Sequence, residues 1–151
     1  MKRSERLAKI NAINHGLENM AGVKLAKVFE EYSAQMNQLE QLKIYKDDYA
    51  EQLRVKMESQ LSVQELRDYK YFFSSIENAI VQQESMVDHL RKKLEKCQSE
   101  WFERRNEVEK LNIAGENLRR GEEAQLARRE QKLSDELTTL MLQRQHTFVS
   151  H

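Results

Sequence analysis

The chain has 151 residues, of which 39% are hydrophobic and 33% are charged, and its mean hydropathy is -0.84. This composition excludes a thick globular core and favours one thin, extended domain. The 25 basic and 25 acidic side chains give a formal net charge of zero, which argues against a protein whose main task is to neutralise nucleic-acid phosphates. Nucleic acid is therefore not an expected partner.

Residue usage predicts an all-α protein. Pro is absent, Gly occurs four times, and Glu, Gln, Lys, Arg and Leu dominate, as in long helices and coiled coils. The single cysteine, Cys97, excludes an internal disulfide, and no apolar run approaches the roughly 18 residues of a transmembrane helix. Without a signal-peptide pattern either, we expect a cytoplasmic protein with no direct membrane insertion.

A first helix is expected over about residues 2–58, where apolar residues form a loose heptad seam. The seam consists of Leu7, Ile10, Ile13, Leu17, Ala21, Leu25, Val28, Tyr32, Leu39, Leu42, Tyr49 and Leu53. A loop follows over about residues 59–62. There Ser62 and Glu65 form a capping box, and Leu61 and Leu66 form a hydrophobic staple, so that a second helix begins near residue 63.

The second helix is expected over about residues 63–145, with residues 146–151 as a frayed tail. Its seam is strong and runs through Leu66, Tyr69, Phe73, Ile76, Ile80, Gln83, Val87, Leu90, Leu94, Cys97, Trp101, Arg104, Val108, Leu111, Gly115 and Leu118. After Gly121 the leucines at 126, 133, 137 and 140 require a four-residue stutter.

Because short connections make antiparallel neighbours, we expect an antiparallel coiled-coil hairpin, a single domain over residues 1–151. Paired residue numbers then sum to about 121, and the second helix overhangs the first. Basic residues exceed acidic ones over 1–30 and 91–120, whereas acidic residues exceed basic ones over 31–60 and 61–90. The middle of the sequence is thus acidic and its flanks are basic.

Two stripes of matching spacing lie side by side under this register. They consist of Gln38, Leu42, Tyr45 and Tyr49 on the first helix, and of Phe72, Ile76, Ala79 and Gln83 on the second. Six of the 11 aromatic residues fall near the loop, and a two-stranded coil buries only a narrow strip. The stripes form either a protein-binding surface or an aromatic cluster that stabilises the turn; spacing alone favours neither.

No catalytic, cofactor-binding or metal-binding residues are expected. The sequence has no Gly-rich phosphate loop, no Cys-x-x-Cys and no His-Glu-x-x-His, and the four histidines, at 15, 89, 146 and 151, are scattered. Its carboxylates fit a solvated helix face, and Cys97 fits a small buried hydrophobe. The basic pairs at 104–105, 119–120 and 128–129 fit an exposed coiled-coil face or a surface that docks an acidic cavity.

Three segments resemble the flagellar FliJ family: LEQLKIYKDDYAEQL (39–53), ELRDYKYFFSSIENAIVQQ (65–83) and ARREQKLSDEL (127–137). The aromatic positions carry the specific part of the match: Tyr45 with Tyr49, Tyr69 with Phe72, and Ala79-Ile80 beyond them. Residues 1–30 fit the family pattern poorly.

The resemblance implies a soluble, non-enzymatic stalk of the flagellar type III export apparatus, similar to the central stalk of rotary ATPases. Its implied partners are the hexameric export ATPase, the export gate membrane protein FlhA, and export chaperones, and it implies peripheral association with the inner membrane at the flagellar base. The eight stripe residues correspond to the family's gate-contacting face. We expect a monomer when the chain is isolated. The alternatives are a structural coiled-coil tether or dimer, and the equivalent stalk of a virulence type III secretion system.

Overall fold

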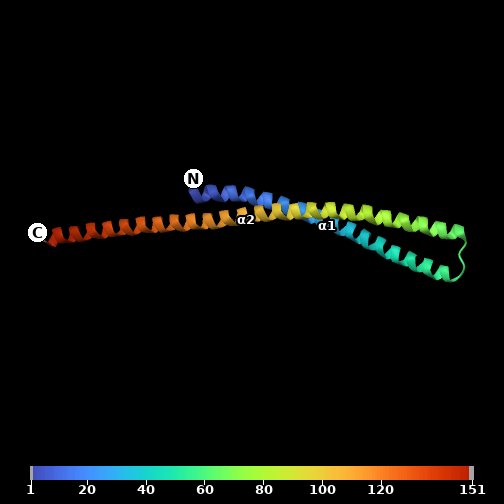
Figure 1. Ribbon diagram of the computed structural model, residues 1–151. Helices are drawn as coiled ribbons and strands as arrows, with labels where there is room; N and C mark the ends of the chain where they lie inside the picture. The colour runs from blue at the N-terminus through green and yellow to red at the C-terminus, as the bar shows by residue number, and fades with distance from the viewer. Residues whose placement is uncertain (1, 150–151) are drawn as a thin grey trace. The chain divides into compact units, whose positions relative to one another are not determined.

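The computed structural model describes the backbone of residues 2–149 and the side chains of residues 2–146. Within that range it has two helices and no strand: α1 spans Arg3–Glu58 (56 residues) and α2 spans Val63–Val149 (87 residues). Residues 59–62 connect them, at the green end of the ribbon (Figure 1). The expected helical hairpin with a longer second helix is confirmed.

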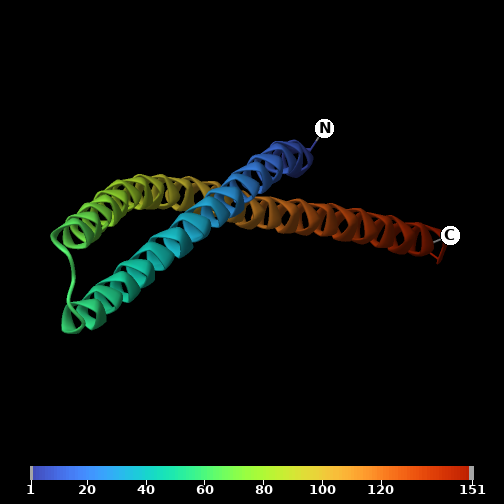
Figure 2. The same cartoon turned by 90° about the vertical axis from the view of Figure 1, so that its right-hand side faces the viewer.

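The loop ends where the sequence predicts a helix cap (Figure 2). The backbone N–H of Glu65 donates to Ser62 Oγ at 3.2 Å, which satisfies one of the amides that the first turn of α2 leaves free. The N–H of Leu66 donates to the Ser62 carbonyl at 3.1 Å, the first backbone bond of the helix. The last turn of α1 closes with the N–H of Ser59 donating to the Lys56 carbonyl at 3.1 Å.

The chain divides into two compact units. Unit 1 combines the start of α1, through Gly16, with the part of α2 from Arg105 onward, and unit 2 spans Leu17–Arg104. Unit 2 contains the loop and both helical segments that flank it. The expected single domain over residues 1–151 stays a prediction.

The apolar core lies in unit 2, along the seam of its two antiparallel segments. One cluster joins Leu39 of α1 to Ile76, Ile80 and Val87 of α2. A second cluster joins Val28 to Leu94 and Cys97, and only 2% of the Cys97 surface is exposed. Since each of these residues belongs to a predicted seam, the heptad pattern of this unit is confirmed, and Cys97 is a buried hydrophobe.

Unit 1 has a more polar seam than the sequence predicts. The expected seam residues Ile10 and Ile13 are 52% and 67% exposed, whereas Asn11 is only 7% exposed. The prediction for Ile10 and Ile13 is therefore wrong. Ile10 and Ile13 form a local apolar pattern, but positions 4, 7 and 11 continue the heptad phase that Val28 and Leu39 set in the same helix.

Hydrogen bonds rather than a large apolar cluster join the two segments of unit 1. Ser4 Oγ donates to Glu122 Oε2 at 2.5 Å, and the Asn11 side-chain amide donates to Asn112 Oδ1. These pairs lie outside the predicted sum of about 121, because a constant register assumes that both helices advance equally along a common axis. Val108 is the buried hydrophobic residue of this unit, 4% exposed.

The part of α2 beyond Glu122 has no buried side chain among the residues described. Every residue from 123 to 146 is exposed, including Leu126, Leu133 and Leu140 at 53%, 58% and 59%. The helix continues to Val149, past the end expected near residue 145, and the rest of the expected tail, residues 150 and 151, lies outside the described range. An unpartnered apolar stripe is therefore available in unit 1.

Candidate protein-binding face

The two predicted stripes meet in unit 2 through a network of aromatic rings. Tyr49 lies at its centre: its ring centroid is 6.2 Å from that of Tyr45, 5.1 Å from that of Tyr69 and 6.3 Å from that of Phe72. Tyr71 adds a fifth ring, 6.0 Å from Phe72 in an edge-to-face arrangement. The predicted pairing of Tyr49 with Phe72 across the two helices is thus confirmed.

We call the eight predicted site residues the tyrosine face, and the structure gives them different degrees of exposure. Gln38, Tyr45 and Phe72 are exposed, the last two at 56% and 55%. Leu42, Tyr49, Ala79 and Gln83 are half-buried. Ile76 is only 8% exposed and belongs to the apolar core, so it lies beneath the exposed residues of this face.

Gln83 pairs with a different residue from the one predicted. Its side-chain amide donates to the carbonyl of Gln35 at 2.9 Å and to Gln35 Oε1 at 2.8 Å, whereas the register predicted Gln38. The shift is one helical turn, because residues three apart lie on the same face of a helix. Gln38 is thereby left exposed at the edge of the face.

Two lysines lie over rings of the same network. Lys46 Nζ lies 5.5 Å from the centroid of Phe73, and Lys56 Nζ lies 5.4 Å from that of Tyr69, both within cation–π range. A hydrogen bond with Tyr69 raises the pKa of Lys56. Burial, followed by the neighbouring Tyr69, raises the pKa of Tyr49.

Sequence reasoning missed three contributors to this region. Tyr71 was counted among the aromatic residues near the loop but was not placed in the site, because it belongs to neither stripe. The two lysine contacts were also missed. Cation–π contacts between helices depend on side-chain direction as well as spacing, so only the position of Lys46 beside the seam could have suggested one.

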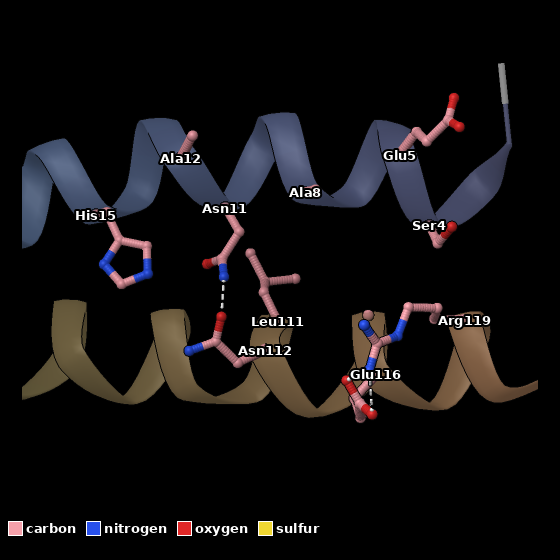
Figure 3. Close-up of a pocket in the computed structure, with 11 residues that line it drawn as sticks. Ser4, Glu5, Ala8, Asn11, Ala12, His15, Leu111, Asn112, Glu116 and Arg119 are labelled. Atoms are coloured by element: carbon pink, nitrogen blue, oxygen red, sulfur yellow. Dashed lines mark hydrogen bonds and ion pairs between the residues drawn. The ribbon is translucent and has the colours of Figure 1, made fainter.

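A groove and a recess lie elsewhere on the described chain. In unit 2, a groove of about 360 Å³ is lined by small and aromatic residues, among them Gly22, Phe29 and Trp101. In unit 1, a recess of about 500 Å³ lies around the pair of Asn11 and Asn112 (Figure 3). The buried Asn11 Oδ1 has no hydrogen-bond partner there.

Three arginines of the basic pairs in unit 1 form contacts within α2. Arg119 donates to both carboxylate oxygens of Glu116, at 2.7 and 2.8 Å, and this hydrogen bond lowers the pKa of Glu116. Arg120 also lies 3.4 Å from Glu116, and Arg128 donates to the carbonyl of Ala124 at 3.4 Å. These are ordinary contacts of an exposed helix at i,i+3 and i,i+4.

Among the described residues, no group of three or more His, Cys, Asp or Glu side chains is arranged to hold a metal ion. Nor does either helix, over its described length, combine the length and apolarity that crossing a membrane requires.

Comparison with known proteins gives one match. The family model described as "Flagellar FliJ protein" matches residues 2–147, nearly the whole chain. No curated protein and no solved structure matches the chain.

Proposed function

The chain belongs to the flagellar FliJ family, since the match covers residues 2–147, and on that premise we propose that it is a non-enzymatic stalk of the export ATPase. Membership makes it a coiled-coil protein associated with flagellar protein export. The finer proposal is that it enters the central pore of the hexameric ATPase, promotes assembly and hydrolysis, and contacts the gate protein FlhA and export chaperones. The family match is the observation that carries this proposal.

The part of the chain proposed to enter the ATPase pore is the exposed end of α2. Residues 123–146 offer an apolar stripe, including Leu126, Leu133 and Leu140, and no side chain of the described chain covers it. A stalk within a ring needs such a surface, because a helix packed inside a pore buries its apolar stripe against the ring. Basic residues on the same stretch, among them Arg128 and Arg129, suit an acidic pore lining.

The tyrosine face is proposed to contact FlhA. The exposure of Tyr45 and Phe72 supports this, because large aromatic residues that a hairpin leaves in solvent are typical anchors of protein interfaces. Through that contact the chain would lie at the inner membrane, at the flagellar base, without inserting into it. We propose a monomer in isolation.

Substitution of the two exposed anchors tests the gate contact. Tyr45→Ala with Phe72→Ala should abolish binding to FlhA while far-UV circular dichroism retains nearly the whole helix signal. Each ring is more than half exposed, so its loss removes little core packing, whereas loss of two interface anchors costs on the order of 4 kcal/mol of binding free energy.

A matched control comes from Phe29 and Phe102, which are 55% and 57% exposed in the same unit. Phe29→Ala with Phe102→Ala should leave FlhA binding unchanged. Equal loss of binding in both double variants would contradict a specific tyrosine face. A large loss of helicity in the Tyr45 and Phe72 variant would instead favour a turn-stabilising role for the rings.

The main alternative is a structural tether or dimer. The exposed stripe of Leu126, Leu133 and Leu140 favours it too, because two copies could bury this stripe against each other. A tether would self-associate as its concentration rises, whereas a stalk would not. No feature of the described chain specifically favours the stalk of a virulence secretion system. The family match is to the flagellar protein.

A further inference from the structure

We propose that the tyrosine face recognises a partner surface with an apolar recess edged by lysine or arginine, and that Asp48 and Asp68 select this surface. The inference rests on the proposed gate contact and adds the chemistry of the partner. It follows from which side chains surround the two exposed aromatic anchors.

Helical spacing fixes the neighbours of each anchor. The side chains at i±3 and i±4 of Tyr45 are Gln41, Leu42, Asp48 and Tyr49, and those of Phe72 are Asp68, Tyr69, Ser75 and Ile76. Six of these eight neighbours are uncharged. The two charged ones, Asp48 and Asp68, are both acidic and both exposed.

The two carboxylates border the same ring network. Asp48 lies three residues after Tyr45 on α1, and Asp68 lies four residues before Phe72 on α2. Asp68 also acts electrostatically on Tyr49, at the centre of the network. Its Oδ1 accepts a hydrogen bond from the side-chain amide of Gln64 at 3.2 Å, a neutral contact that leaves the negative charge in place.

Two lysines of the ring network contact aromatic rings. Lys46 lies over the ring of Phe73, which is half-buried, and Lys56 lies over the ring of Tyr69. Among the described residues, neither lysine forms an ion pair with Asp48 or Asp68. Among the i±3 and i±4 neighbours of Tyr45 and Phe72, the charged side chains are therefore acidic, whereas Lys56 acts on Tyr49 with the opposite sign.

Such a surface is complementary to one kind of partner. Interfaces place aromatic anchors in desolvated pockets and leave charges at the rim, where they steer association and reject partners of like charge. An acidic rim around Tyr45 and Phe72 favours a pocket with basic residues at its edge and disfavours an acidic one.

The test measures the dissociation constant for FlhA, in detergent and from the same organism, at about 50 mM and about 300 mM salt. Asp48→Asn with Asp68→Asn keeps the side-chain shape and removes both charges. We expect binding about ten-fold weaker at low salt, with the difference shrinking at high salt as rim charges are screened. Asp48→Lys with Asp68→Lys should weaken binding further.

Asp47 supplies the control, since it is exposed and adjacent to Asp48 but points about 100° away around the helix. Asp47→Asn should bind within about two-fold of the unsubstituted chain at both salts. The inference is overturned if the double Asn variant behaves like Asp47→Asn, or binds more tightly. If Tyr45→Ala with Phe72→Ala also leaves binding intact, the gate contact itself is wrong; if that variant loses binding, only the charge inference is wrong.

Discussion

Gly22 and Gly16 lie in the same helix but in different surroundings. A Cβ at Gly22 would lie 3.4 Å from Trp101 Nε1, whereas a Cβ at Gly16 would meet nothing within 4 Å. Small residues such as Gly22 let the two segments of unit 2 approach closely beside Trp101, while the rings of Tyr49, Tyr69 and Phe72 fill the space between them nearer the loop. The size of the residues along the seam thus sets how closely the two segments of unit 2 approach each other.

Gly16→Ala should stabilise the chain by about 0.5–1 kcal/mol, because alanine restricts the unfolded backbone and no neighbour obstructs its methyl group. Gly22→Ala should stabilise it no more than Gly16→Ala, since its methyl group would meet Trp101 at the tight limit of van der Waals contact. Thermal unfolding followed by far-UV circular dichroism compares the two. A lower midpoint for Gly16→Ala than for the unsubstituted chain would contradict this reasoning.

Individual contacts were predictable from sequence where both partners are large and apolar. Tyr49 and Phe72 meet as expected, because heptad spacing places both beside the same seam. Gln83 was misassigned by one turn, since an amide side chain reaches partners on either side of its own position. The burial of Ile76 follows from its place in the predicted seam, whereas the lysine contacts do not follow from spacing.

The contacts between α1 and α2 differ between the two units. In unit 2, apolar clusters around Leu39 and Val28 line the seam. In unit 1, Asn11 occupies the seam and donates to Asn112, an exposed residue of α2, beside a recess of about 500 Å³. A polar side chain at a core position of a coiled coil lowers stability and specifies which residues pair, and we interpret Asn11 in this way.

Replacement of the pair by leucine should raise stability. Asn11→Leu with Asn112→Leu removes a buried oxygen that has no partner and adds apolar contact, which should stabilise the chain by about 1–2 kcal/mol. Asn117→Leu, at an exposed position of α2, is the control and should change the unfolding midpoint little. A lower midpoint for the paired variant would show that the asparagines contribute more than pairing specificity.

The helix bounds at the loop were predictable because each signal there has a local cause. The Ser62 cap fixes the start of α2, and the predicted end of α1 near residue 58 matches Glu58. The seam of unit 1 was not predictable in the same way. Ile10 and Ile13 formed a local apolar pattern, but the phase of the long helix places Asn11 inward instead, which only continuity with the later core reveals.

At the scale of the whole chain, the described residues leave several large apolar side chains in solvent. Among them are those of the tyrosine face of unit 2 and of the leucine stripe between residues 123 and 146 of unit 1. A structural hairpin needs neither, because exposed apolar surface promotes association. Membership of the FliJ family accounts for both if each meets a partner of the export apparatus.

The most direct test of the stalk proposal is light scattering of the purified chain, followed by its titration into the flagellar export ATPase with hydrolysis as the readout. We predict a scattering mass near 18.0 kDa, the mass of one chain, and a rise in hydrolysis at substoichiometric amounts. A stable dimer that leaves hydrolysis unchanged would contradict the account and indicate a structural coiled coil.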